Sequence, residues 1–427
     1  MFIKYLMIVG AGLSSLAFAQ NTALCDSIPQ TRHQGYHLER SIPWLNKPSD
    51  GVWKWNSPPK VKAWLGKDTP TGEIVGRSRE LTVDKGSTGI VIAERMMDNW
   101  DPAEATTDNE GYLFLTSSKL LYVGHWVDRY IWYNRNTGTT ADQVKAKVPI
   151  LVISHWIKCP RYVLGDGREC KDTTDSVRND TASTSMMGIG FGRTGDGQGD
   201  STPDKNPLLN INMIGSTAVT TSNFWHGWIV NQAGLIAGLT KENFDDREFK
   251  DNEAQLPVVD PVPATVYHRS WHQLQGFVKA QGVPTGDGLS VDILLDTGID
   301  YSSIRIPGDS DRPATWEPWD TTWSSHVVSG QRFLDSGVNV HVQLGVPEVA
   351  DQTYTVTTGT IDDTSVTPVK VNKYHKGDDP RKEFVNTGSH IFRKLEVAFD
   401  PVCGRLAFNP TPSPTPVISS AHKELLK

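Results

Sequence analysis

Two segments far apart in the chain each place an aspartate after an apolar run and two residues before a glycine. They are Leu81–Gly86, which contains Asp84, and Val291–Gly298, which contains Asp296. An apolar run that ends at a glycine turn is typical of a buried strand that stops at the edge of a sheet. Two carboxyl groups held face to face share one proton, so one acts as base and the other as acid. Asp84 and Asp296 are therefore candidate catalytic residues.

The surroundings of the two aspartates repeat as well. Each aspartate is followed, later in the chain, by a second glycine landmark: Met186–Gly192 after the first and Thr387–Arg393 after the second. Short runs rich in Val, Ile, Thr, Tyr and Trp recur between Gly, Pro, Asn and Asp clusters throughout the sequence, which indicates β-structure. Two units of similar length and order predict two similar β lobes, each offering one carboxylate from a glycine-containing turn.

These motifs resemble the pepsin-like aspartic peptidase family. Asp296-Thr297-Gly298 matches the family signature, Asn386–Asp400 resembles its late segment, and Val402–Phe408 resembles its closing strand. The resemblance covers most of the chain after the first 70 or so residues. It implies an all-β fold, a bilobal pepsin-like double β-barrel with six-stranded-type lobes and a central cleft. It also implies that one aspartate comes from each lobe and that a water between them attacks the substrate carbonyl.

The same resemblance assigns roles to neighbouring residues. Thr297 would belong to a pair of hydroxyls that brace the two turns, and Ser87 would bond the outer oxygen of Asp84. Gly86 and Gly298 would line the substrate site. A flap hairpin with a tyrosine would follow the first aspartate, and three aromatic residues are candidates for substrate contact there: Tyr122, Trp126 and Tyr130. The alternative is that these aromatic side chains belong to the core of a β-hairpin.

Two positions depart from the family pattern. Lys85 stands where the first brace hydroxyl would be, and Ile299 stands where the second turn would carry a hydroxyl. A cation close to a carboxylate lowers the pKa of the carboxylate by about 1–3 units. Lys85 would therefore remove the proton that the two aspartates share, or it would form an ion pair that blocks the water. We therefore count Lys85 with the catalytic candidates and expect altered chemistry. The alternative is that Lys85 points to solvent and the pair works weakly.

The N-terminus and the cysteines predict the compartment. Residues 1–19 have a basic start, an apolar run and a small-x-small end at Ala17–Ala19, which is typical of a signal peptide. No later stretch has the roughly 18 apolar residues that a membrane span needs. Four cysteines allow three pairings. The turn between Cys159 and Cys170 favours a local disulfide, which leaves Cys25 to pair with Cys403. Asn179 lies in the one glycosylation sequon.

The chain divides into six predicted segments. They are a signal peptide (1–19), an N-terminal segment (20–69), an N-terminal β lobe with Asp84 (70–250), a proline-rich linker (251–264), a C-terminal β lobe with Asp296 (265–409) and a flexible tail (410–427). Residues 20–69 have few basic residues for a pepsin-type propeptide. A bond between Cys25 and Cys403 would keep that segment attached.

Composition narrows the function. The 427 residues carry a net charge of −7, which argues against nucleic acid or an anionic membrane as main partner. Neither metal-ligand spacing nor a cofactor motif is present, and we expect a monomer. We expect a secreted, non-proteolytic pepsin-fold protein whose cleft binds or transforms an apolar small molecule, for example in a cyclisation, or binds a peptide. The alternative is an acid aspartic endopeptidase that uses Asp84 and Asp296, so whether the protein is an enzyme, and of which kind, stays open at this stage.

Overall fold

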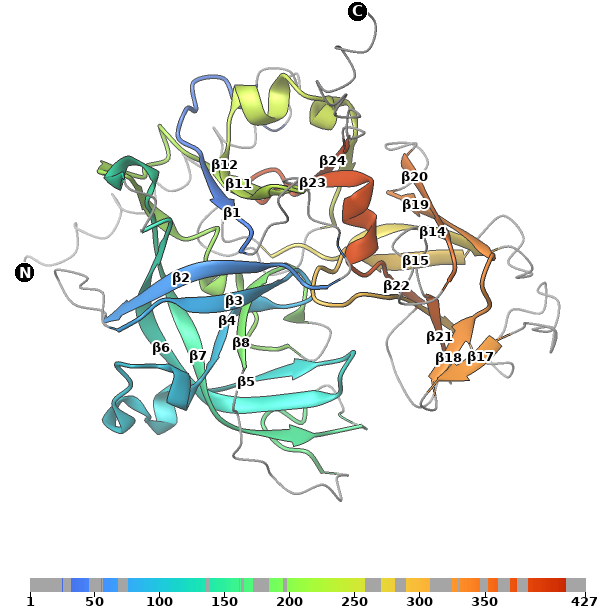
Figure 1. Ribbon diagram of the computed structural model, residues 1–427, viewed down its shortest axis with the longest axis horizontal. Helices are drawn as coiled ribbons and strands as arrows, with labels where there is room; N and C mark the ends of the chain where they lie inside the picture. Colours follow the sequence, from blue (N-terminus) through green and yellow to red (C-terminus); the bar gives the residue numbers. More distant parts are fainter. Residues whose placement is uncertain are drawn as a thin grey trace, which may run out of the picture.

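A computed structural model places three β-sheets around a centre where the two halves of the chain meet (Figure 1). It describes residues 25, 32–45, 55, 57–67, 76–135, 139–160, 162, 165–171, 184–194, 198–257, 270–280, 289–307, 325–328, 331–345, 352–359, 369–374 and 383–411. The predicted signal peptide, Asn179 and nearly all of the predicted tail lie outside the described residues. Among the described residues, no helix has the length and apolarity to cross a bilayer.

The first nine-stranded sheet carries Asp84. Its strands, in chain order, are β2 (Lys60–Lys67), β3 (Arg79–Asp84), β4 (Thr88–Ala93), β5 (Glu110–Leu115), β6 (Leu120–Tyr133), β7 (Val144–Lys158), β8 (Ser185–Ile189), β9 (Ile211–Ile214) and β10 (Thr217–Ala218). Every residue of β4 is buried, as expected for a strand covered on both faces. The strand order is β10-β9-β7-β4-β8-β3-β2-β6-β5.

The second nine-stranded sheet follows Asp296 in the same way. Its strands are β14 (Leu274–Ala280), β15 (Leu289–Leu294), β16 (Ser302–Pro307), β17 (Ser325–Val328), β18 (Gln331–Leu334), β19 (Asn339–Leu344), β20 (Gln352–Thr357), β21 (Val369–Tyr374) and β22 (Phe384–Asn386). They are ordered β17-β18-β21-β16-β22-β15-β14-β19-β20.

A third sheet joins the two ends of the chain. It has six strands in the order β1-β12-β11-β23-β24-β13. They are β1 (Arg40–Pro43), β11 (Trp225–Val230), β12 (Gly234–Leu239), β13 (Glu253–Gln255), β23 (Leu395–Asp400) and β24 (Arg405–Pro410). Strand β13 lies within the segment expected to be a linker. Figure 1 shows this sheet beside both lobes, with β11 and β12 between the blue β1 and the C-terminal strands.

The internal repeat of the sequence reappears as a repeated strand order. The centre of the first sheet reads β7-β4-β8-β3-β2, and the centre of the second reads β21-β16-β22-β15-β14. In each lobe the strand that leads to the aspartate runs parallel to the glycine-landmark strand, as β3 does to β8 and β15 to β22. The predicted all-β, bilobal, pepsin-like fold is confirmed. The lobes differ from the expected six-stranded type, because hairpins at their edges extend each sheet to nine strands.

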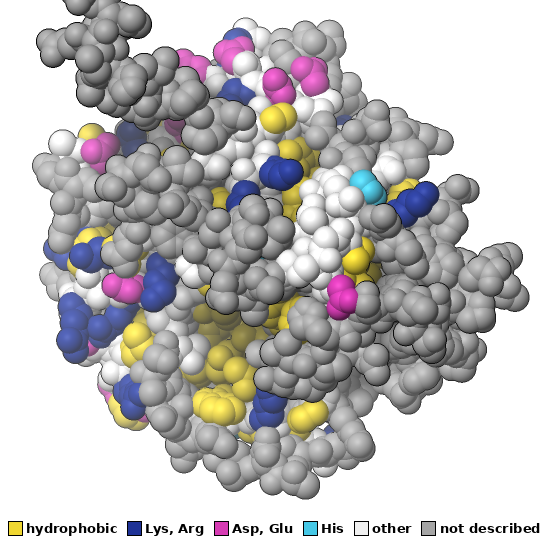
Figure 2. All heavy atoms as spheres, turned by 45° about the vertical axis from the view of Figure 1, so that its right-hand side comes forward, with side chains coloured by type: hydrophobic (Ala, Val, Ile, Leu, Met, Phe, Trp, Pro, Cys, Tyr) yellow, Lys and Arg dark blue, Asp and Glu magenta, His cyan; other side chains and the backbone are white. Residues whose placement is uncertain are grey.

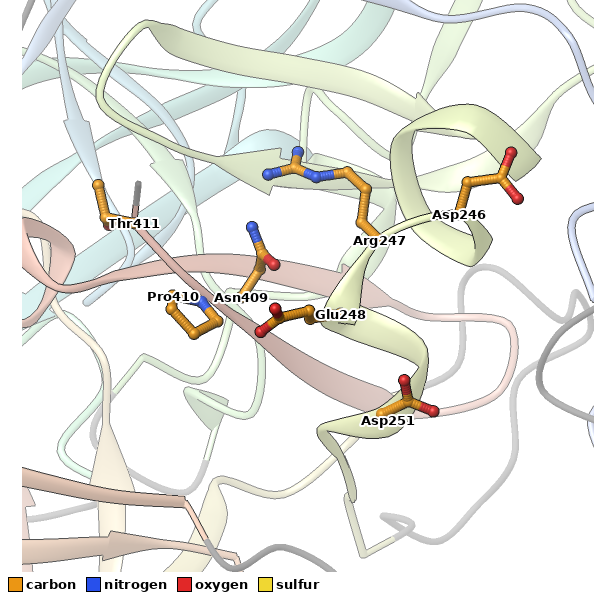
Figure 3. Close-up of a pocket in the computed structure, with 7 residues that line it drawn as sticks. All are labelled: Asp246, Arg247, Glu248, Asp251, Asn409, Pro410 and Thr411. Carbon is orange, nitrogen blue, oxygen red and sulfur yellow. The ribbon is translucent and has the colours of Figure 1, made fainter. Parts of the chain in front are cut away.

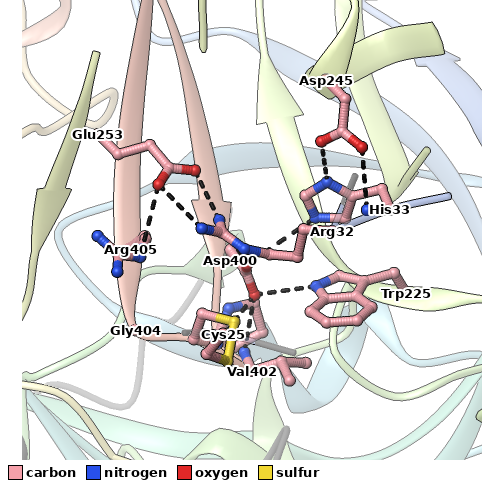
Figure 4. A network of polar contacts seen from close by, with 12 residues as sticks. Cys25, Arg32, His33, Trp225, Asp245, Glu253, Asp400, Val402, Gly404 and Arg405 are labelled. Atoms are coloured by element: carbon pink, nitrogen blue, oxygen red, sulfur yellow. Dashed lines mark hydrogen bonds and ion pairs between the residues drawn. A yellow bond between two sulfur atoms is a disulfide. The ribbon is translucent and has the colours of Figure 1, made fainter. Parts of the chain in front are cut away.

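Both predicted disulfides are confirmed. Cys159 is bonded to Cys170 and Cys25 to Cys403, and no free cysteine remains. Disulfides of this kind persist in oxidising compartments. The second bond ties the N-terminal segment to the turn between β23 and β24, at the edge of a buried polar network (Figure 4). The N-terminal segment is thus part of the folded body.

Candidate active site

The two aspartates lie at the ends of matching strands. Asp84 is the last residue of β3, and Asp296 lies two residues after the end of β15. Their exposed fractions are 7% and 4%. Parallel pairing fixes their height in the sheets, since Asp84 is in register with Gly188 of β8 and Leu294 with Asn386 of β22. The strand ends of both lobes therefore deliver a buried carboxyl group to the same place.

The first carboxyl group is held by its own turn. Gly86 donates its backbone N–H to Asp84 Oδ1 at 2.6 Å, and Ser87 donates its hydroxyl to Asp84 Oδ2 at 2.6 Å. The second carboxyl group is held differently. Gly298 donates its N–H to Asp296 Oδ1 at 2.7 Å, but the donor to Asp296 Oδ2 is the Asn386 amide, at 2.7 Å. Asn386 therefore occupies the role that Ile299, which has no hydroxyl, cannot fill.

The two carboxyl groups interact directly across the lobe boundary. Burial raises the pKa of Asp84 to about 8, and the charge of Asp296 and a hydrogen bond with it act in the same direction. The hydrogen bonds from Ser87 and Gly86 oppose this shift. At neutral pH Asp84 therefore keeps a proton next to Asp296, which is the arrangement that acid–base catalysis by paired carboxyls needs.

Thr297 alone braces the two turns. Its hydroxyl donates to the Val83 carbonyl at 2.8 Å and accepts the Lys85 backbone N–H at 3.0 Å. The hydroxyl that would return this contact from the first turn is absent, because Lys85 stands there. The first turn is instead held from within its own lobe. Gly86 O accepts hydrogen bonds from Arg193 Nε at 2.8 Å and from Gln198 Nε2 at 3.0 Å, and both donor side chains are buried.

The structure rules out the alternative that Lys85 points to solvent. Its side chain is only 3% exposed, and Nζ has no hydrogen-bond partner among the described residues. Nζ lies 4.4 Å from the centroid of the Trp228 ring and 5.6 Å from that of Phe392. Burial lowers the pKa of Lys85 to about 7, and the Asp296 charge opposes this shift. The pKa of Asp84 is raised in spite of the neighbouring lysine, first by burial and then by Asp296.

The glycines of both turns lie against the carboxyl pair. A Cβ at Gly298 would lie 2.6 Å from Asp84 Oδ1 and 3.1 Å from Asp296 Oδ1. Gly298→Ala is therefore expected to push the two carboxyl groups apart and to lower the pKa of Asp84 toward its ordinary range, because the contribution of Asp296 shrinks with distance. Carboxyl ¹³C NMR of the variant checks this, and an unchanged Asp84 titration contradicts it.

The predicted substrate-contacting aromatic residues lie along β6. Tyr122 is buried in a cluster with Leu113 and Leu151. The indole N–H of Trp126 donates to Asp200 Oδ2 at 3.2 Å, and Tyr130 lies under the ammonium group of Lys145, 4.1 Å from ring centroid to Nζ. These contacts describe packing within the first lobe. The substrate-binding role of the three side chains stays a prediction.

The sequence did not predict the roles of three buried polar residues at the site: Asn386, Arg193 and Gln198. Asn386 directly precedes the second glycine landmark and Arg193 follows the first, so both positions were next to a recognised motif. For Asn386 the available signal was a polar residue at the end of the apolar strand β22. Among the described residues, no cluster of three or more His, Cys, Asp or Glu side chains has the arrangement of a metal site.

A surface hollow lies away from the carboxyl pair. It is formed by the helical turns after β12 and by the end of β24, and Figure 3 shows its residues: Asp246, Arg247, Glu248, Asp251, Asn409, Pro410 and Thr411. Arg247 is already paired with Glu396. Its lining side chains are charged or polar except for Pro410, so it lacks the mostly apolar lining of a small-molecule site.

Comparison with known proteins finds similarity to solved structures but not to family models or curated sequences. No protein-family model matches the sequence, and no curated protein does. Among solved structures, the chain is similar to the crystal structure of an aspartic proteinase from Irpex lacteus, with 14% sequence identity and a TM-score of 0.45. The match covers 89% of this chain and 99% of that one. At this level of similarity, the match is silent on the catalytic residues.

Proposed function

We propose that this secreted protein is an acid–base catalyst that uses Asp84 and Asp296 on an apolar small molecule and that it does not cleave peptides. The observation that carries the proposal is the pair of buried carboxyl groups, each held by its own donors, in which burial and Asp296 raise the pKa of Asp84 to about 8. A neutral carboxyl group at neutral pH donates a hydrogen bond to a carbonyl oxygen and thereby polarises it. Such a group suits a rearrangement or cyclisation guided by hydrogen bonding.

The first turn argues against a peptide substrate. Gly86 was expected to line the substrate site, but its carbonyl already accepts hydrogen bonds from Arg193 and Gln198. A carbonyl oxygen has two lone pairs, so two donors leave no acceptor for the backbone N–H of an extended peptide. Apolar side chains gather on the face shown in Figure 2.

An acid endopeptidase is the second candidate. It is favoured by the complete set of hydrogen bonds on both carboxyl groups and by the inward direction of Lys85, which removes the expected obstacle to proton sharing. In that case Asp84 would act as the acid and Asp296 as the base on a scissile amide.

A peptide library distinguishes the two candidates. The mature protein is incubated with it between about pH 3 and 7, together with the Asp296→Asn and Lys85→Thr variants. We expect no cleavage by the native protein. Cleavage that disappears in Asp296→Asn would establish the endopeptidase. In parallel, thermal unfolding is measured with a panel of apolar ketones and lactones, and ligands of the site are expected to raise Tm of the native protein but not of Asp84→Asn.

A further inference from the structure

The hydrogen-bond donors on the two carboxyl groups differ in kind. Asp84 Oδ2 faces the Ser87 hydroxyl, which donates a hydrogen bond or, after rotation, accepts one. Asp296 Oδ2 faces the NH₂ group of Asn386, which only donates. If Asp84 is protonated at Oδ2, the Ser87 hydroxyl can accept a hydrogen bond from it. If Asp296 is protonated at Oδ2, its O–H would point at an N–H of Asn386, and neither group could accept.

The orientation of the Asn386 amide is fixed by its other end. Asn386 Oδ1 accepts the Gly388 backbone N–H at 2.9 Å, so the NH₂ group must face Asp296. The backbone of Asn386 is held on both sides, since it pairs with Leu294 of β15 and with Ser303 of β16. With an exposed fraction of 6%, the side chain has no competing water-filled alternative. The amide cannot flip without losing both of its bonds.

We infer that Asn386 is a positioning residue that makes the carboxyl pair directional, holding the proton on Asp84 and leaving Asp296 as the proton acceptor. The inference rests on the acid–base role proposed for the pair. In the reaction, Asp84 donates its proton or a hydrogen bond to an oxygen of the substrate, and Asp296 takes a proton from the substrate or from water. A symmetric pair would begin each turnover with the proton on either group.

The test reads the proton directly and needs no substrate. Aspartate carboxyl carbons are labelled with ¹³C, and the two signals are assigned by their loss in Asp84→Asn and Asp296→Asn. In the native protein we expect the Asp84 signal to show protonation up to about pH 8, because the Asn386 amide, which only donates, keeps the shared proton off Asp296 Oδ2. In Asn386→Leu we expect both signals to move over the same pH range, because the proton is then divided between the groups.

A double variant tests whether Asn386 fixes the location of the proton or only supplies Asp296 with a hydrogen bond. Ile299→Thr in the Asn386→Leu background supplies a hydroxyl to Asp296, as Ser87 does to Asp84. We expect it to restore stability but to leave the proton divided, since hydroxyls on both sides make the pair symmetric. It also gives the comparison if Asn386→Leu alone fails to fold. Asn409→Leu is the matched control, because Asn409 is likewise buried and donates to a carboxylate, Glu396, at 2.6 Å. It should leave both signals unchanged.

The outcomes are distinct. Native-like signals in Asn386→Leu, or a full return to the native pattern in the double variant, would overturn the directional role of Asn386. If neither aspartate of the native protein keeps a proton above about pH 6, the proposed function itself fails, because the pair then has no acid at neutral pH.

Discussion

Arg32→Met is expected to lower the free energy of unfolding by about 3–5 kcal/mol, because it strands buried carboxylates. Arg32 Nη1 and Nη2 donate to the two oxygens of Glu253 at 2.6 and 3.1 Å, and Nη1 lies 3.7 Å from Asp400 Oδ2 (Figure 4). The side chains of Arg32 and Asp400 are fully buried, and that of Glu253 is 6% exposed. Removal of Arg32 takes away the bidentate partner of Glu253 and the guanidinium near Asp400. Arg405 Nε remains 3.5 Å from Glu253 Oε2, but it does not replace the two hydrogen bonds that are lost.

The loss should depend on pH in a defined direction. Burial raises the pKa of Glu253, and Arg32 opposes that shift through its hydrogen bonds and its charge. Without Arg32 the folded-state pKa rises further above the unfolded value. A raised carboxyl pKa favours the folded state at acidic pH, and this stability is lost as pH rises through the folded pKa. The free energy of unfolding that Arg32→Met loses relative to the native protein should therefore be larger at pH 7–8 than at about pH 4.

Urea unfolding at both pH values measures the effect. Lys60→Met is the control, because Lys60 and Glu80 form an exposed pair at 3.5 Å and should contribute less than about 1 kcal/mol. A loss for Arg32→Met no larger than that of Lys60→Met would contradict the prediction. A confirmed loss would show that the N-terminal segment completes the folded core and does not behave as a removable propeptide.

Lys85→Met is expected to stabilise the protein by about 2–4 kcal/mol below about pH 7, against the usual trend of substitutions in a core. The pKa of Lys85 falls from 10.5 to about 7 on folding because the amine is buried. A depressed lysine pKa favours the folded state at alkaline pH, and that stability is lost as pH falls through the folded pKa. The ammonium group recovers about 2 kcal/mol at most from the Trp228 ring. Methionine keeps the length and the aromatic contact without the charge.

The pH profile identifies the origin of the gain. The difference between Lys85→Met and the native protein should be largest below about pH 7 and should vanish near pH 10.5. Asp84 gives the opposite dependence, because its raised pKa favours folding at low pH and this stability is lost up to about pH 8. Asp84→Asn should therefore remove the loss of stability between acidic pH and about pH 8 and should leave the gain of stability at alkaline pH that comes from Lys85. A gain in Lys85→Met that is independent of pH would show that packing, and not charge burial, is responsible.

Local patterns in the sequence determined the frame of the site. Apolar runs ending in Asp-x-Gly turns, and their repetition, predict two lobes and the two aspartates, because strand periodicity and glycine turns act over a few neighbouring residues. Cysteine spacing in the same way favoured the pairing of Cys159 with Cys170, which left Cys25 for Cys403. The extension of each lobe to nine strands was not predictable in this way, because edge hairpins join a sheet through long-range contacts.

Only the tertiary structure shows what Lys85 and Ile299, the two departures from the family pattern, do at the site. The side chain of Lys85 lies on Trp228, and the donors that hold the carboxyl turns, Arg193, Gln198 and Asn386, are 107, 112 and 90 residues from their acceptors. A lysine next to an aspartate in sequence predicts a nearby cation, but Lys85 lies in the turn after β3, and this turn directs its side chain onto Trp228. The chemistry of the pair therefore depends on which residues the fold brings behind each turn, and no local pattern encodes that.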